Sequence, residues 1–202
     1  VELSSYYLDV LKDRLYCSGR NSEHRRSAQT ALFRILKDTL VLMAPILPFT
    51  TEEAWEAMPD YEGKSESVHL ELFPDFSEMW LEEDTFQEWE DLGGIREAVL
   101  KELEKAREDK LIGNSLEAAI KVRAPETQRA LLEKYHPELP SLFIVSTVEL
   151  DEAGSEEIKV SVERVPWQKC LRCWNYSDHV GTSESYPDFC GRCEDVVRKM
   201  DL

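Results

Sequence analysis

Four cysteines near the end of the printed sequence have the spacing of a metal site. Cys170 and Cys173 form one Cys-x-x-Cys pair, and Cys190 and Cys193 form a second pair after 16 intervening residues. Two residues between cysteines let a tight turn direct both sulfurs to one point, and paired zinc motifs are typically separated by about 15–20 residues. Four thiolates complete a tetrahedral shell with Zn–S distances of about 2.3 Å. We therefore predict one structural Zn²⁺ held by these four cysteines.

Other interpretations of the cysteines are less well supported by the sequence. Two disulfides would need an oxidising compartment, whereas the sequence shows no signal peptide and carries a fifth cysteine, Cys17. A redox Cys-x-x-Cys needs one pair at a helix N-terminus rather than two facing pairs. A closed four-sulfur shell has no open position for catalysis, and His179 is not needed as a ligand. Gly191, inside the second pair, is expected to supply the positive φ of a tight turn.

Apart from the four cysteines, the sequence shows no recognisable catalytic or nucleotide-binding motif. It has no Gly-rich nucleotide loop and no Gly-x-Ser-x-Gly elbow, and its four histidines have no spacing that suggests a joint site. Cys17 lies at the end of a predicted helix beside apolar residues, so we expect a buried structural thiol. No catalytic residue is predicted, and the chain does not read as a complete enzyme.

Charge and aromatic residues indicate RNA binding at the two ends of the chain. The net charge is −17, yet residues 12–37 hold seven Lys/Arg and two acids, whereas residues 50–110 hold 20 acids and six bases. Basic side chains neutralise phosphates and aromatic rings stack on unpaired bases. A solvated charged face is the alternative for each basic run, and packing against the zinc module is the alternative for Trp174. The predicted RNA contacts are Lys12, Arg14, Arg20, Arg25, Arg26, Arg172, Trp174 and Arg192.

Apolar spacing predicts helices in the N-terminal part of the chain. One helix is expected over residues 4–17 and a longer one from its cap, Ser22, to about residue 44. Thr50 and Glu53 form a capping box that predicts a third start at Thr50. Helices joined by such short connections indicate a helical bundle.

The middle of the chain is expected to hold one long helix. Residues 67–74 before it read as extended, because apolar side chains alternate there. The helix is predicted over residues 85–110, interrupted or kinked at Gly93 and Gly94, and ended by Gly113 as its C-cap. Its apolar stripe and its many charges suit one buried and one solvated face.

After the long helix the period changes towards strands. Strands are predicted over residues 119–123, 142–149 and 159–164, with a helix over residues 125–135. The last two strands would be joined through a hairpin connection at residues 151–157. The expected fold class is mainly α with a small α+β part, followed by a four-cysteine zinc module.

These elements divide the chain into three expected parts. Residues 1–83 would be a helical domain with an extended connection, residues 84–165 a long helix with a small α+β subdomain, and residues 166–202 the zinc-binding module. The chain begins at Val1 rather than Met, so we expect a fragment of a longer protein.

Several stretches resemble one family. Residues 7–16 and 26–30 resemble the start of the anticodon-binding domain of isoleucyl-tRNA synthetases. Residues 44–55 resemble a segment shared by the class I synthetases for isoleucine, leucine and valine, and residues 67–70 and 112–118 fit the same pattern. The tail motifs Cys-Leu-Arg-Cys-Trp and Cys-Gly-Arg-Cys resemble the C-terminal zinc module of the bacterial isoleucine enzyme. A similar finger occurs in base-excision DNA glycosylases.

This resemblance implies the C-terminal part of a bacterial isoleucyl-tRNA synthetase. That part would bind the anticodon stem and loop of isoleucine tRNA, while the parent attaches isoleucine to the tRNA using ATP. The His-Ile-Gly-His and Lys-Met-Ser-Lys-Ser signatures and the editing domain are not in this sequence, so ATP and Mg²⁺ would act only in the absent catalytic part. We expect a cytoplasmic, monomeric protein that binds neither membrane nor DNA.

Two interpretations that assign the chain to other functional classes of protein stay open. A DNA-repair zinc-finger module is suggested only by the similar finger, since the N-terminal catalytic proline of that family is absent and the helical motifs have no place in it. A protein-interaction adaptor is suggested by the acidic middle, which could bind a basic partner. Preference for folded tRNA over duplex DNA, or binding to neither, would separate them.

Overall fold

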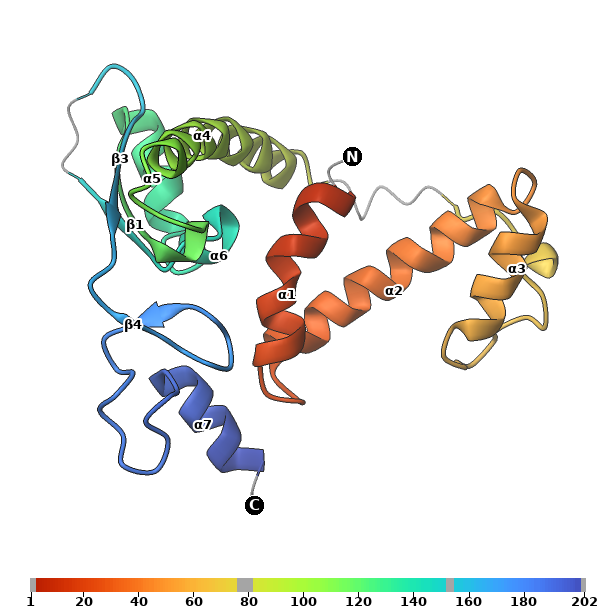
Figure 1. Cartoon of the computed structure of the whole chain (residues 1–202). Helices are drawn as coiled ribbons and strands as arrows, with labels where there is room; N and C mark the ends of the chain where they lie inside the picture. The colour runs from red at the N-terminus through yellow and green to blue at the C-terminus, as the bar shows by residue number, and fades with distance from the viewer. Residues whose placement is uncertain (1–2, 76–81, 152–154, 201–202) are drawn as a thin grey trace. The chain divides into compact units, whose positions relative to one another are not determined.

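The computed structural model describes residues 3–75, 82–151 and 155–200. The chain forms two compact units, which we call the large unit, residues 1–19 and 82–202, and the small unit, residues 20–81 (Figure 1). Within the described residues, every helix is too short or too polar to cross a membrane.

The small unit is built from two helices around one tryptophan. Helix α2 spans Glu23–Met43 and begins as predicted, since the Ser22 side chain accepts a hydrogen bond from the Arg25 backbone N–H at 3.3 Å. Helix α3 spans Pro48–Ala57. The indole N–H of the fully buried Trp55 donates to the Ser65 carbonyl at 2.9 Å. The core of this unit comprises Leu40, Val41, Ala44, Trp55, Met58 and Val68.

Helix α3 begins two residues earlier than predicted, so the capping box at Thr50 is wrong. Pro48 occupies the first helical position, where its missing N–H costs nothing and its fixed φ suits a helix. The Thr51 hydroxyl then donates to the Leu47 carbonyl at 2.9 Å.

The extended run predicted at residues 67–74 is also wrong. Val68–Leu70 forms a 3₁₀ turn, and Leu72 is 88% exposed. Only Val68 of the alternating apolar residues enters the core, so the alternation does not mark the face of a sheet.

The large unit contains the long helix. Helix α4 spans Glu83–Glu108 without interruption at Gly93 and Gly94, which corrects the predicted break. Its C-terminus lies before Gly113, because Lys110 adopts the left-handed conformation (φ 59°) and the Leu111 N–H donates to the Ala106 carbonyl at 2.9 Å. This is the arrangement of a helix C-cap. The apolar stripe predicted for α4 is confirmed as buried. It comprises Ile95, Val99, Leu103 and Ala106.

A three-stranded sheet lies against α4. Strands β1 (Ala118–Arg123), β2 (Thr147–Leu150) and β3 (Lys159–Arg164) are ordered β2-β1-β3. Strand β2 is parallel to β1 and β3 is antiparallel to it. Because β2 and β3 flank β1 rather than each other, the predicted hairpin connection is wrong.

Two helices make the crossover between the parallel strands. Helix α5 spans Glu126–Lys134, as predicted, and α6 spans Leu139–Phe143. The start of the strand predicted at residues 142–149 is therefore helical, and Ile144 in the left-handed region (φ 57°) turns the chain into β2. Figure 1 shows α4, α5 and α6 gathered beside the sheet.

The N-terminal segment belongs to this unit. A π-helical turn, Leu3–Tyr7, leads into α1, Leu8–Cys17. Val10 joins the core around α4, β1, α5 and α6, and the Arg96 guanidinium lies 3.9 Å from the centre of the Tyr6 ring.

The zinc tail completes the large unit. Strands β4 (Gln168–Lys169) and β5 (Tyr176–Ser177) form an antiparallel ribbon, and α7 spans Gly191–Met200. The fold class is confirmed: mainly α, with a small α+β part and a four-cysteine module. The predicted division of the chain into three parts, with boundaries at residues 83 and 165, stays a prediction.

Candidate metal centre and nucleic-acid interface

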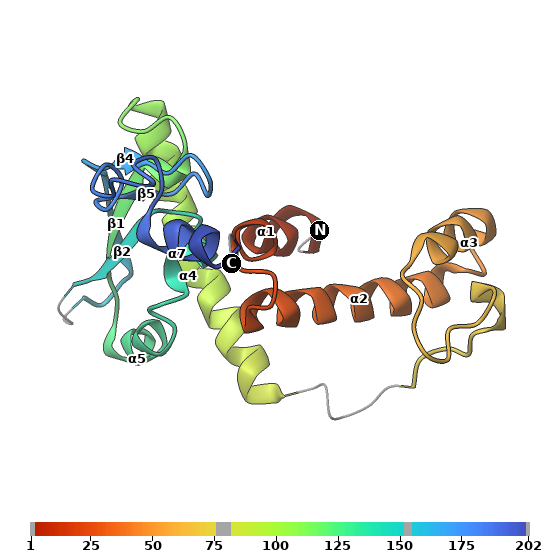
Figure 2. The same cartoon turned by 90° about the horizontal axis from the view of Figure 1, so that it is seen from below.

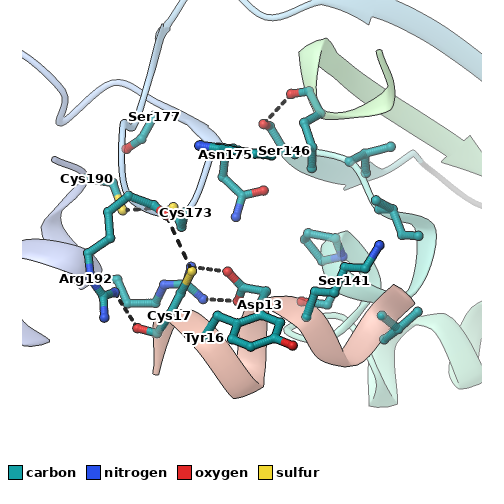
Figure 3. A pocket seen from close by; sticks show the side chains of 18 of the residues that line it. Asp13, Tyr16, Cys17, Ser141, Ser146, Cys173, Asn175, Ser177, Cys190 and Arg192 are labelled. Atoms are coloured by element: carbon teal, nitrogen blue, oxygen red, sulfur yellow. Dashed lines mark hydrogen bonds and ion pairs between the residues drawn. The ribbon is translucent and has the colours of Figure 1, made fainter. Parts of the chain in front are cut away.

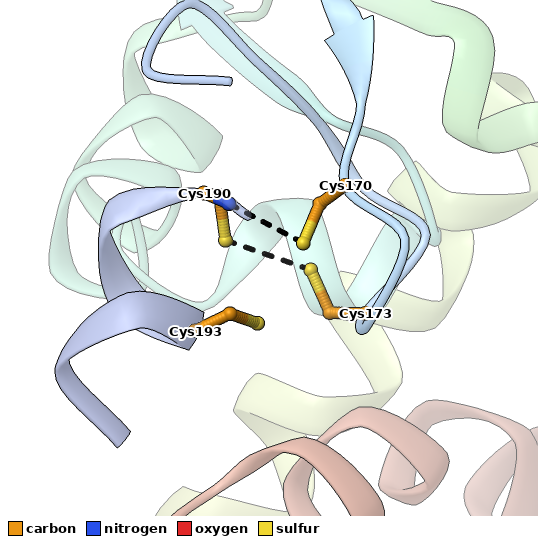
Figure 4. A group of neighbouring side chains, drawn as sticks. All are labelled: Cys170, Cys173, Cys190 and Cys193. Carbon is orange, nitrogen blue, oxygen red and sulfur yellow. Dashed lines mark hydrogen bonds between the residues drawn. The ribbon is translucent and has the colours of Figure 1, made fainter. Parts of the chain in front are cut away.

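Two local structures present the four cysteines to one another. Cys170 and Cys173 lie in the turn between β4 and β5, where the Trp174 N–H donates to the Cys170 carbonyl at 2.9 Å. Cys190 immediately precedes α7 and Cys193 lies in its first turn. Figure 4 shows the four side chains pointing toward one centre.

The sulfur geometry fits a tetrahedral metal. All four Sγ atoms lie within 4.8 Å of one another, and those of Cys173 and Cys190 are 3.7 Å apart. A tetrahedron with Zn–S bonds of about 2.3 Å has edges of about 3.8 Å, whereas a disulfide needs about 2.05 Å. The Cys190 backbone N–H also donates to Cys170 Sγ at 3.3 Å, a contact that orients a ligand sulfur. The donors fit a closed structural zinc site.

The thiols of the cluster bias one another's protonation. Hydrogen bonds from the Cys190 and Cys193 thiols lower the pKa of Cys173, while the same contact with Cys173 raises the pKa of Cys190 to about 11. A metal must therefore displace protons to bind all four sulfurs, so its affinity falls as the pH is lowered. Outside the cluster, burial and then Asp13 raise the pKa of Cys17 to about 11, consistent with the predicted inert thiol.

The left-handed residue of the zinc turns is Trp174, not Gly191. Trp174 has φ 69°, an uncommon conformation for a bulky side chain that marks a position fixed by its surroundings. Gly191 instead begins α7, and a Cβ on it would lie 3.6 Å from the His179 ring. That is an ordinary van der Waals distance, so this position requires a glycine neither for close approach nor for positive φ, and the predicted positive φ is wrong.

A buried carboxylate ties the long loop of the module to α7. Glu194 accepts hydrogen bonds from His179 Nε2 at 3.0 Å, from the Ser183 hydroxyl at 2.9 Å and from Arg198. These contacts, His179 first, lower the pKa of Glu194 to about 2. His179 thus has a structural partner, in agreement with its omission from the ligand set.

Two arginines of the zinc turns contact α1. Figure 3 shows the first of them, Arg192, reaching Asp13. Arg192 donates from both terminal nitrogens to the Asp13 carboxylate, with Nη2–Oδ1 at 2.6 Å. Arg172 Nη1 donates to the Cys17 carbonyl at 2.6 Å, and Cys17 Sγ donates to the Arg172 carbonyl at 3.7 Å. Figure 2 shows α7 beside α1, as the contact between Arg192 and Asp13 requires. The two guanidinium groups therefore have protein partners.

A cavity of about 740 Å³ opens between α1, α6 and the zinc turns. Two aromatic residues on its wall are largely exposed, Tyr16 at 75% and Trp174 at 62%. The Lys169 ammonium lies 4.9 Å from the centre of the Trp174 ring. Lys12 lines the same cavity. Aromatic faces and a cationic group, the two features that bind unpaired nucleotides, therefore occur together there.

The predicted RNA contacts divide between the two units. Lys12, Arg172, Trp174 and Arg192 line the cavity of the large unit. Arg14 lies on the same helix as Lys12, whereas Arg20, Arg25 and Arg26 belong to the small unit.

Sequence reasoning missed part of the cavity wall. It did not single out Asp13, and it did not predict that α6 residues such as Ser141 would face the zinc turns. Asp13 and Arg192 are 179 positions apart, and a single sequence carries no signal that pairs such distant residues.

The first 122 residues match the family model described as the anticodon-binding domain of tRNA ligase. The chain belongs to this family. A second model, described as a zinc finger found in FPG and IleRS, matches residues 168–196 of the chain and includes all four clustered cysteines.

Three similar curated proteins are isoleucine–tRNA ligases. Isoleucine–tRNA ligases from Syntrophotalea carbinolica, Fervidobacterium nodosum and Thermotoga petrophila are 47%, 43% and 42% identical to this chain, each over 98% of its length. The chain spans about 22% of the length of these relatives. The resemblance to the C-terminal part of bacterial isoleucyl-tRNA synthetases is confirmed.

Proposed function

We propose that this chain is the tRNA-binding C-terminal region of a bacterial isoleucine–tRNA ligase. It holds the anticodon stem and loop of isoleucine tRNA, while the parent enzyme joins isoleucine to that tRNA. The contribution of this region is positioning, with no bond made or broken by its own residues.

The zinc in this proposal is structural. Cys170, Cys173, Cys190 and Cys193 hold one Zn²⁺, which fixes the turn that carries Trp174. The module has few apolar side chains of its own, with Val180 and Phe189 packed beside the cysteines. Such a segment depends on its metal for folding.

One observation carries the proposal. In a member of the anticodon-binding family, an exposed tryptophan in a constrained backbone conformation lines the same cavity as Tyr16 and Lys12. The exposure of Trp174 favours base stacking over the alternative of packing against the module. Lys12 pairs with Asp9 at 2.5 Å but remains 67% exposed at its side chain, so its charge stays available to a phosphate.

The remaining predicted cations have separate roles in this proposal. Arg14 extends the basic surface of α1, and Arg20, Arg25 and Arg26 contact phosphates from the small unit. The acidic residues of the middle segment face solvent or repel misplaced RNA.

The wider setting follows from the same assignment. We propose a monomer that works in the cytoplasm and binds no DNA or membrane. ATP and Mg²⁺ serve the catalytic part of the full ligase, which lies outside this sequence.

Filter-binding titration of the zinc-loaded chain tests the proposal. Isoleucine tRNA, a non-cognate tRNA and duplex DNA are compared across a range of salt concentrations. Cognate preference is expected. The logarithm of the affinity should fall with the logarithm of the salt concentration with a slope of several units, because each phosphate contact contributes about 0.7 in single strands and about 0.9 in B-form DNA. Equal binding of duplex DNA would favour the DNA-repair interpretation of the finger, and binding to no nucleic acid would favour a protein adaptor.

A further inference from the structure

We infer that Asp13 is a positioning residue for tRNA binding, although it is an acid on a surface that meets a polyanion. Together with Arg192 and Arg172 it fastens α1 to the zinc module and so sets the width of the cavity between them. This inference rests on the proposed function for its consequence in RNA binding, but the fastening itself can be tested without RNA.

The first fastening point is a carboxylate–guanidinium pair. Both oxygens of Asp13 accept from the two terminal nitrogens of Arg192, the two-bond geometry that fixes orientation as well as distance. The Asp13 side chain is 22% exposed and that of Arg192 is 47% exposed. Arg192 precedes the ligand Cys193, so this pair joins α1 directly to a metal-binding turn.

The second point closes the C-terminus of α1. Arg172 Nη1 donates to the carbonyl of Cys17, the last residue of that helix, where terminal carbonyls lack partners within the helix and attract cations. The same nitrogen lies 3.6 Å from the sulfur of Cys193. One guanidinium thus bridges a helix end and a cluster sulfur, and a metal-bound thiolate strengthens that contact by its charge.

The fastened elements carry opposite walls of the cavity. Lys12 and Tyr16 project from α1, whereas Trp174 comes from the zinc turn. Releasing Asp13 from Arg192 lets these walls move apart, although it frees a cation and removes an anion. If fastening dominates, Asp13→Asn therefore weakens RNA binding. If direct electrostatics dominates, the same change strengthens RNA binding.

The test measures isoleucine tRNA affinity of the full chain with Asp13→Asn. We expect affinity to fall about fivefold, the effect of losing roughly 1 kcal/mol from a well-formed, partly exposed ion pair. Zinc content should stay at one per chain. The exchanged pair Asp13→Arg with Arg192→Asp should recover most of the affinity. Unchanged or tighter binding by Asp13→Asn would overturn the inference.

Asp151→Asn is the matched control. Asp151 pairs with Arg123 through Nε at 3.1 Å and Nη2 at 2.5 Å, and the side chains are 29% and 48% exposed. This is also a carboxylate–guanidinium pair, of similar exposure to the first, although both of its nitrogens donate to one carboxylate oxygen. It lies at the sheet, outside the cavity. Its loss should leave tRNA affinity unchanged.

Hydrogen exchange separates the fastening from the proposed function. In Asp13→Asn, backbone amides of residues 11–17 should exchange faster, as they should after zinc is removed from the original chain. If the original chain binds no tRNA, the proposed function fails. The exchange rates of residues 11–17 still show whether Asp13 and the zinc module hold α1 in place. Unchanged exchange in both conditions would overturn the fastening.

Discussion

Replacing Cys173 with serine removes one sulfur from the cluster and leaves the rest of the chain unaltered. Beside the cysteines, the apolar packing of the zinc module consists mainly of Val180 and Phe189. Burying two such side chains contributes about 3–6 kcal/mol, whereas structural zinc in small fingers contributes about 10–16 kcal/mol. The metal therefore stabilises the module more than its apolar packing does, and we expect Cys173→Ser to unfold residues 168–196.

The small unit should survive this change because its core is separate. Trp55 and its neighbours pack between α2 and α3 without residues of the zinc module. We expect the amides of these helices to keep their exchange rates, while amides of the module lose protection and tRNA affinity falls. Zinc content, measured by atomic emission after dialysis, should drop from one equivalent to none.

Cys17→Ser is the matched control for this experiment. Cys17 is a buried thiol of the large unit, whereas Cys173 is partly buried, and Cys17 lies outside the four-sulfur cluster. The control should retain one zinc and an ordered module. A Cys173→Ser chain with an ordered, metal-free module, or a Cys17→Ser chain that loses zinc, would show that the four-cysteine zinc site does not hold the module together.

Three further changes probe other parts of the molecule. Trp174→Ala with zinc retained should weaken tRNA binding by about 1–3 kcal/mol if the ring stacks on a base; unchanged affinity in filter binding would make it a packing residue. Trp55→Ala should lower the unfolding free energy of the small unit by about 3–5 kcal/mol, read from urea denaturation, without loss of zinc. Hydrogen bonds from Lys134 and then Tyr135 lower the pKa of Glu88 below its ordinary value of 4.5. The ionised Glu88 carboxylate therefore stabilises the fold above pH 4.5, and this stabilisation is lost as the pH falls below 4.5. Glu88→Gln should remove the contribution of Glu88 to the acid dependence of the melting temperature. An unchanged acid dependence in Glu88→Gln would contradict this role of Glu88.

Local chemistry made much of the fold predictable. The paired cysteines identify a metal module because ligand spacing in sequence determines which sulfurs a tight turn can bring together. The stripe from Ile95 to Ala106 identifies α4, because an amphipathic helix of that length has few alternatives. Ser22 identifies the start of α2 through its side-chain oxygen.

The errors arose where two local signals competed. At α3 the proline at position 48 prevailed over the capping box at Thr50, because its φ is already helical. At the end of α4, Lys110 accepts the left-handed conformation that glycine usually takes. The apolar run from Leu142 was ambiguous between strand and buried helix, and the structure divides it between α6 and β2.

The metal ligands of the site could be predicted from the sequence, but the residues that line the cavity beside it could not. Cys170 and its partners follow from spacing, whereas the contact of Asp13 with Arg192 depends on tertiary packing. Charge and position on the zinc turns predict Arg172 and Arg192 as RNA contacts, yet both guanidinium groups bind α1. Charge indicates the kind of partner a surface suits, but it does not reveal which cations are already paired.

Chemical footprinting of isoleucine tRNA would show most directly whether the chain binds the anticodon through its zinc module. The zinc-loaded chain should protect nucleotides of the anticodon stem and loop and leave the acceptor stem reactive. Protection of the loop should weaken in Trp174→Ala and in chelator-treated protein. Protection confined to the acceptor stem, or loop protection that is indifferent to zinc, would contradict the proposed function.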